Sequence, residues 1–97
     1  MKLRSVDDGA LLLFWCPGCK GPHPYWVKPV NGPTVWQFNG DMQRPTFTPS
    51  LLVYPHGDHP RCHLFLTDGM LQFCGDSGHE LAGKTVPLPD WPIGGDS

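Results

Sequence analysis

The sequence predicts a mainly β protein, a small single domain of short antiparallel strands stapled by one zinc site. Of its 97 residues, 12 are glycine and 12 are proline, and this composition favours turns and short strands over helices. A hairpin pattern and four cysteines with metal-site spacing are the other two observations. We expect one domain over residues 1–97, with flexible ends at 1–9 and 92–97. So short a chain buries a limited fraction of its surface, and a bound metal would stabilise it.

The first predicted strand is the apolar run at residues 10–15, Ala-Leu-Leu-Leu-Phe-Trp. A continuous apolar run of this length is typical of a buried strand, and Pro17 and Gly18 would cut a helix short. The strand leads into Cys16-Pro17-Gly18-Cys19, a turn that presents two thiols to one point. This turn predicts half of a zinc site.

Two short strands follow at residues 25–27 and 34–38. A turn at Asn31-Gly32-Pro33 separates them, so we expect these strands to pair with each other.

The next segment, residues 44–50, holds two prolines that forbid regular pairing in a central strand. It predicts a stiff, extended stretch, and residues 51–54 return to a strand pattern. Beyond the hairpin described below, residues 75–83 predict a turn or one helical turn, and residues 85–89 predict an extended edge.

The run from Cys62 to Cys74 predicts a β-hairpin, because Asp68-Gly69 is a strong signal for a two-residue loop between strands. Side chains alternate between the two faces of a strand. One face of the hairpin is therefore apolar and predicted to face the core: Cys62, Leu64, Leu66, Leu71 and Phe73. The other face carries His63, Phe65, Gln72 and Cys74, and this register sets His63 opposite Cys74.

The metal site follows from this register. Residues directly opposite each other have Cβ atoms about 4.5–5.5 Å apart, so His63 and Cys74 could reach one ion. Together with Cys16 and Cys19 they predict a closed Cys₃His site for a structural Zn²⁺. A Cys₄ site that uses Cys62 remains an alternative, although it needs a β-bulge to turn that side chain over.

Two other histidines remain as alternative ligands. They are His23, which we expect at the surface, and His79, and a chain that binds no metal is the remaining alternative.

Charge and hydropathy exclude several classes of function. The formal net charge is −2 and only seven basic residues are present, scattered along the chain, so no nucleic-acid surface is predicted. No stretch reaches the ~20 apolar residues of a membrane span, and the polar N-terminus lacks a cleavage site for secretion. We expect a cytoplasmic protein with reduced, metal-bound thiols.

Several blocks of sequence resemble a small phage and bacterial family whose phage members are often labelled ammonia monooxygenase. The resemblance covers roughly residues 10–91 and depends on the joint order of five blocks. These blocks are residues 14–19 (FWCPGC), 36–41 (WQFNGD), 45–51 (PTFTPSL), 62–63 (CH) and 76–83 (DSGHELAG). Relatives in bacterial ubiquitin-like conjugation operons act as serine peptidases on the ubiquitin-like protein.

The resemblance implies specific roles. It marks Ser50 as the nucleophile, His79 as the base and Asp76 as the group that orients the base, and it marks the same four metal ligands. His63 is the second choice for the base if it does not bind zinc. Phage relatives often have a cysteine in place of Ser77 and an aliphatic residue in place of Cys74, which puts the fourth ligand in question.

Two functions are therefore expected. The first is a hydrolase that cleaves the tail of a ubiquitin-like or other protein. The alternative is a non-catalytic zinc-binding module that binds another protein, such as a phage modulator of host defence.

Overall fold

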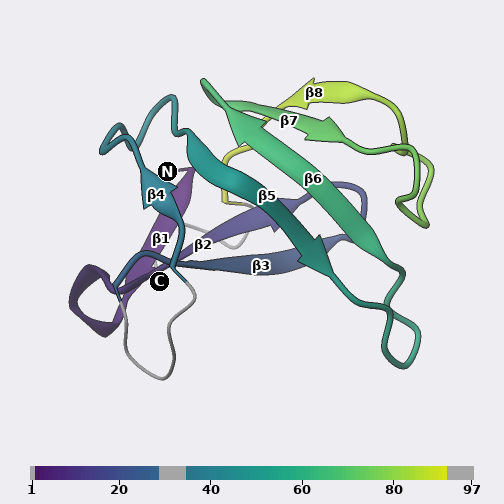
Figure 1. Cartoon of the computed structure of the whole chain (residues 1–97), viewed down its shortest axis with the longest axis horizontal. Helices are drawn as coiled ribbons and strands as arrows, with labels where there is room; N and C mark the ends of the chain where they lie inside the picture. Colours follow the sequence, from purple (N-terminus) through teal and green to yellow (C-terminus); the bar gives the residue numbers. More distant parts are fainter. Residues whose placement is uncertain (1, 29–34, 92–97) are drawn as a thin grey trace.

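The computed structural model describes residues 2–28 and 35–91, and it arranges them in two antiparallel sheets that lie one over the other (Figure 1). One sheet has three strands in the order β1-β2-β3, and the other has five in the order β4-β5-β6-β7-β8. The predicted mainly β fold of antiparallel strands is confirmed. Among the described residues no helix is long and apolar enough to cross a membrane.

The smaller sheet contains β1 (Leu3–Val6), β2 (Leu11–Cys16) and β3 (Gly21–Trp26). The predicted strand at residues 10–15 is β2, which ends at Cys16 as expected. The first residues were expected to form a flexible end, but the structure pairs β1 with β2 and buries Leu3 in the core. A short 3₁₀ turn, η1 (Asp7–Gly9), joins these two strands.

The larger sheet contains β4 (Gln37–Phe38), β5 (Phe47–Val53), β6 (Cys62–Thr67), β7 (Met70–Phe73) and β8 (Thr85–Pro87). Strands β6 and β7 form the predicted hairpin in the predicted register, with Leu64 opposite Phe73 and Thr67 opposite Met70. Both loop residues have positive φ, 51° at Asp68 and 75° at Gly69, as a two-residue hairpin loop of type I′ requires. The edge expected near residues 85–89 is β8.

The predicted pairing of residues 25–27 with 34–38 is wrong where the structure describes it. Strand β3 pairs with β2, whereas β4 pairs with β5. Between the described parts of the two segments, Trp36 N donates a backbone hydrogen bond of 2.8 Å to Trp26 O. The predicted turn at 31–33 and the predicted flexible end at 92–97 lie outside the described residues.

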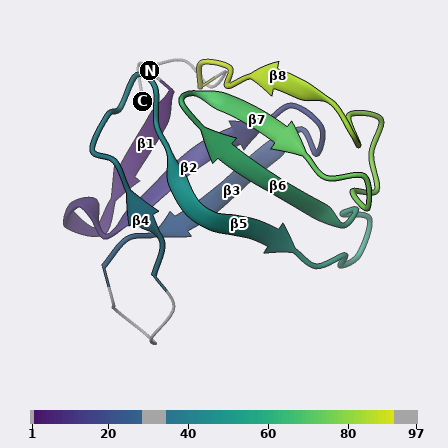
Figure 2. The same cartoon turned by 45° about the horizontal axis from the view of Figure 1, so that its top comes forward.

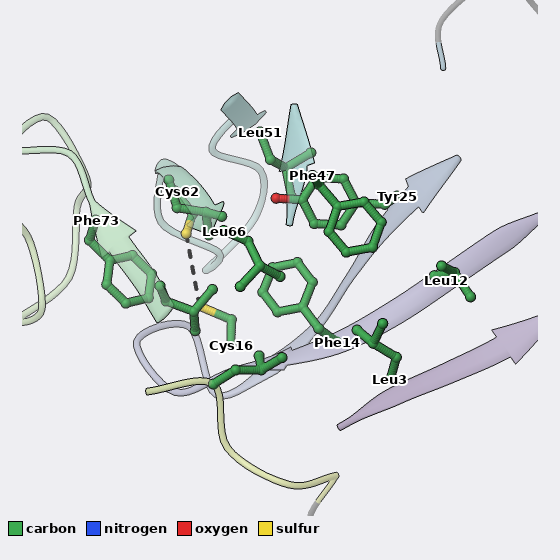
Figure 3. Close-up of a cluster of buried hydrophobic side chains, with 13 residues drawn as sticks. Leu3, Leu12, Phe14, Cys16, Tyr25, Phe47, Leu51, Cys62, Leu66 and Phe73 are labelled. Carbon is green, nitrogen blue, oxygen red and sulfur yellow. Dashed lines mark hydrogen bonds between the residues drawn. The ribbon is translucent and has the colours of Figure 1, made fainter. Parts of the chain in front are cut away.

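The core lies between the two sheets, with β5, β6 and β7 passing over β2 and β3 (Figure 2). Rings from both sheets meet there: Tyr25 of β3 stacks on Phe47 of β5, with 4.0 Å between ring centroids. Figure 3 shows Cys16 and Cys62 within this cluster, Cys16 from the smaller sheet and Cys62 from the larger. The core therefore joins the sheets through apolar packing and brings two thiols together.

Candidate active site and candidate metal centre

Strand β6 positions polar groups on both of its faces. Cys62 points into the core and is fully buried, whereas the next residue, His63, lies on the outer face with 27% of its side chain exposed. This alternation is the ordinary geometry of a strand. Two separate groups of functional side chains result, one around His63 and one around Cys62.

On the outer face, the imidazole of His63 lies between a hydroxyl and a carboxylate. Its Nε2 is 3.2 Å from Ser50 Oγ, and its Nδ1 is 3.2 Å from Asp76 Oδ1. Both distances are within reach of the hydrogen bonds that link a serine nucleophile, its base and the group that orients the base. The arrangement can take a proton from the hydroxyl and hold the imidazolium that forms.

An irregularity in β5 brings Ser50 to this point. Four residue steps separate Phe47 from Leu51 on β5, whereas their partners on β6, Leu66 and Leu64, are two steps apart. The extra residues bulge from the ladder. The Ser50 carbonyl accepts a hydrogen bond of 3.2 Å from Trp36 Nε1, which fixes the backbone at the bulge. The predicted stiff segment is thus part of a central strand, and its irregular pairing was correctly expected.

The turn after β7 places Asp76 beside His63. Cys74 N donates to the His63 carbonyl at 2.8 Å, and Gly78 N donates to the Arg61 carbonyl at 2.7 Å. Between them, Ser77 Oγ donates to the His63 carbonyl at 2.9 Å and accepts from His63 N at 3.1 Å. These bonds continue the pairing along β6, so the turn is fixed against the residue that carries the imidazole.

Arg61 holds the other oxygen of the same carboxylate. Its Nε donates to Asp76 Oδ2 at 3.0 Å, and its Nη2 lies 2.9 Å from that oxygen. The hydrogen bond from Arg61, followed by that from His63, lowers the pKa of Asp76. The carboxylate is therefore ionised at neutral pH, as a group that stabilises an imidazolium must be.

The second group lies on the core side of β6. The Sγ atoms of Cys16, Cys19 and Cys62 and a ring nitrogen of His23 all lie within 4.8 Å of one another. A tetrahedral zinc ion with Zn–S bonds of about 2.3 Å and Zn–N bonds of about 2.0–2.1 Å separates its ligand atoms by about 3.3–3.8 Å. Small side-chain movements would close the cluster around such an ion.

The burial of His23 and the lack of a hydrogen-bond partner for its Nε2 support a cation in this cluster. His23 is 2% exposed, and its Nε2 has no hydrogen-bond partner. The expectation that His23 lies at the surface is wrong, because β3 turns this side chain toward Phe14 in the core. A buried nitrogen without a partner is costly. A metal ion would satisfy it.

The three thiols differ in acidity because they crowd one another. The hydrogen bond with Cys62 lowers the pKa of Cys16, and Cys16 Sγ also accepts from Cys19 N at 3.4 Å. Burial raises the pKa of Cys19 to about 11, and the hydrogen bond with Cys16 raises that of Cys62. One thiolate thus forms readily, and a cation would be needed to stabilise three.

His79 lies beside the cysteine cluster. Its Nε2 is 3.5 Å from Cys62 Sγ, its Nδ1 accepts a hydrogen bond of 3.2 Å from Leu81 N, and its ring packs edge-on against Phe73. The ring also lies so close to Gly18 that a Cβ at that position would collide with it.

The structure therefore groups the predicted residues differently from the sequence analysis. The predicted ligands Cys16 and Cys19 lie with Cys62 and His23, whereas the other two predicted ligands, His63 and Cys74, lie with Asp76 on the outer face. Ser50 and Asp76 both contact His63, which had been the second choice for the base. The hairpin register was right. The missing information was the face of the hairpin on which the CxxC turn packs.

Two signals in the sequence pointed to the observed cluster. Cys62 falls on the apolar face of the hairpin, and Cys16 ends an apolar run, so both belong to the core. His23 alternates with Tyr25, which places the two side chains on one face of a strand.

A protein-family model described as "Bacterial ubiquitination-like system serine protease (BubE)" matches residues 2–74. This segment contains Ser50, His63 and the four residues of the buried cluster. No curated protein and no solved structure matches the chain.

Proposed function

The chain belongs to the BubE family of bacterial ubiquitination-like system serine proteases, and on this premise we propose that it is a serine peptidase with a Ser50–His63–Asp76 triad. The observation that carries the proposal is the position of the His63 ring, 3.2 Å from Ser50 Oγ on one side and 3.2 Å from Asp76 Oδ1 on the other. His63 replaces His79, which lies beside Cys62, as the proposed base.

The proposed reaction proceeds through an acyl-enzyme. His63 Nε2 takes the proton from Ser50 Oγ as this oxygen attacks the carbonyl carbon of the scissile bond, and the imidazolium then gives that proton to the leaving amine. A water molecule, deprotonated by the same nitrogen, hydrolyses the ester and returns Ser50 to its starting state. Asp76 accepts the hydrogen bond from Nδ1–H throughout, and Arg61 keeps it ionised.

The proposed substrate is an extended protein tail, as on a ubiquitin-like protein of such a system. The three residues lie on the outer face of the larger sheet, which leaves room for a chain laid across the strands. Phe65 is 41% exposed, and its ring centroid lies 6.3 Å from that of His63. An open hollow of about 200 Å³ on the paired strands β4 and β5 is lined in part by Thr48, two residues before Ser50. One substrate side chain would pack against the Phe65 ring, and another would enter this hollow.

We also propose that Cys16, Cys19, Cys62 and His23 hold one structural zinc ion. Three sulfurs and one nitrogen are a usual ligand set for structural zinc, and four protein ligands leave no position for a reacting water. The ion would cross-link the turn between β2 and β3 to the first residue of β6. Since that residue precedes His63, the cross-link would also hold the base in place.

All four cysteines are free in the structure. Reduced thiols suit a reducing compartment, and we propose that the protein acts in the cytoplasm.

The proposed activity is tested with a panel of ubiquitin-like precursors carrying C-terminal extensions, incubated with wild type and Ser50→Ala and separated by mass. Wild type should cleave a precursor, and Ser50→Ala should not, while Ser5→Ala on β1 serves as a matched serine control with full activity. Equal cleavage by wild type and Ser50→Ala would contradict the proposal. If no precursor is cleaved but wild type and Ser50→Ala bind one equally well, the chain is a binding module.

A further inference from the structure

We propose that His63, Cys74 and Asp76 form a second, exchangeable zinc site, and that zinc bound there switches the peptidase off. The inhibitory part rests on the proposed function, whereas the binding part does not. A ring nitrogen of His63, the sulfur of Cys74 and a carboxylate oxygen of Asp76 all lie within 4.8 Å of one another. Nitrogen, sulfur and carboxylate oxygen are the three ligand types that bind zinc in proteins.

The hairpin holds these three residues together. Cys74 N donates to the His63 carbonyl at 2.8 Å, so the two residues sit opposite each other across β6 and the end of β7. Asp76 follows two residues later, and its Oδ1 is already 3.2 Å from His63 Nδ1, close to the ligand separation of a tetrahedral site. Arg61 binds Oδ2, which leaves Oδ1 to serve as a ligand.

Exposure distinguishes this site from the buried cysteine cluster. The side chains of His63 and Asp76 are 27% and 44% exposed, and Cys74 is half-buried. Three protein ligands would leave at least one position of a tetrahedral ion open to solvent. Zinc at this site would therefore exchange with the surrounding solution, unlike an ion enclosed by Cys16, Cys62 and their neighbours.

Zinc bound at this site would remove the base from the triad. Cys74 would lose its thiol proton to solvent, and the ion would take the place of the Nδ1 hydrogen between His63 and Asp76. A neutral imidazole with a metal on Nδ1 carries its hydrogen on Nε2. That nitrogen would then donate to Ser50 Oγ and could not accept the serine proton.

The test uses protein that already carries one zinc per chain in the buried cluster. Zn²⁺ is added in small steps to the cleavage assay, and Co²⁺ is added in parallel while the near-ultraviolet charge-transfer band of a Co²⁺–thiolate bond is recorded. Four proteins are compared: wild type, Cys74→Ser, Ser50→Ala and Gln72→Ser, the last as a control on the same face of β7.

In wild type and Gln72→Ser, the first equivalent of Co²⁺ added to this zinc-loaded protein should give the thiolate band, and Zn²⁺ should inhibit reversibly, with activity restored by a mild chelator. Loss of an outer-shell partner costs about 10–100-fold in metal affinity, so loss of the sulfur in Cys74→Ser should weaken inhibition by at least about tenfold. Cys74→Ser should also lose the band while retaining its basal activity. Ser50→Ala should be inactive yet bind Co²⁺ like wild type, which separates the binding claim from the peptidase claim.

Two results would overturn the inference. One is a thiolate band or zinc inhibition that is unchanged in Cys74→Ser. The other is wild-type activity that falls when the exchangeable metal is removed, because the ion would then be required for the reaction.

Discussion

The two thiols at the ends of the β6–β7 hairpin should respond to the same substitution in opposite ways. Cys62 is fully buried, with its Sγ 3.9 Å from Cys16 Sγ, whereas Cys74 is half-buried on the outer face. If the buried cluster holds the structural zinc, Cys62→Ser should lose the metal and Cys74→Ser should keep it. This pair therefore tests which face of the hairpin carries the cross-link.

The expected magnitudes are far apart. Structural zinc contributes about 10–16 kcal/mol in small peptides, comparable to the whole unfolding free energy of a domain, about 5–15 kcal/mol. Losing the fully buried Cys62 from the four proposed ligands should consequently leave Cys62→Ser unfolded or reduce its stability by several kcal/mol. A substitution at a partly exposed position usually changes the unfolding free energy by about 0.5 kcal/mol or less, which is a change of roughly 2–4 °C in Tm for Cys74→Ser.

The assay combines elemental analysis of zinc per chain with thermal unfolding followed by circular dichroism, in the presence of a thiol reductant. Cys62→Ala serves as a control for packing, since it removes the ligand without burying a hydroxyl. Zinc retained by both Cys62 variants, together with zinc lost from Cys74→Ser, would refute the assignment. Protein purified without metal that remains fully folded in strong chelator would refute it as well.

Three further variants test how the triad is built. His63→Ala should lower kcat at least about 10³-fold. The side chain of His79 lies beside Cys62, so His79→Ala should keep its activity within about tenfold of wild type and should instead lower Tm. The reverse order in the cleavage assay would restore His79 as the base. Ser77→Ala removes two hydrogen bonds to the His63 main chain, each with a net contribution of about 1 kcal/mol, so urea unfolding should show a loss of about 1–3 kcal/mol and kcat should fall with it. A loss of stability with an unchanged kcat would mean that the turn does not position Asp76 for the reaction.

The hairpin could be predicted from the sequence because all of its determinants are local. The Asp68-Gly69 loop sets the register, and alternation then fixes which side chains share a face, so Cys74 was correctly placed opposite His63. The same pattern correctly indicated that the apolar face is covered by the core, but the hairpin alone does not show on which of its faces the distant CxxC turn will pack. The CxxC turn packs on the apolar face, and the predicted ligand set therefore combined residues from opposite faces.

Strand β5 illustrates a second limit. Its prolines correctly indicated irregular pairing, yet the strand is central in the sheet, because the extra residues bulge out between Phe47 and Leu51. That bulge brings Ser50 to His63. The contact between Ser50 and His63 could not be predicted from their positions along the chain, because they lie on different strands and meet only through the register of the folded sheet.

The most direct test of the central claim is covalent labelling of the nucleophile. Wild type is incubated with a fluorophosphonate, digested and mapped by mass spectrometry, and the labelling rate is compared with those of His63→Ala and His79→Ala. We predict a single adduct on Ser50, formed at least about 100-fold more slowly in His63→Ala and at nearly the wild-type rate in His79→Ala. An adduct on a different residue, or a labelling rate unchanged by His63→Ala, would contradict the proposed triad.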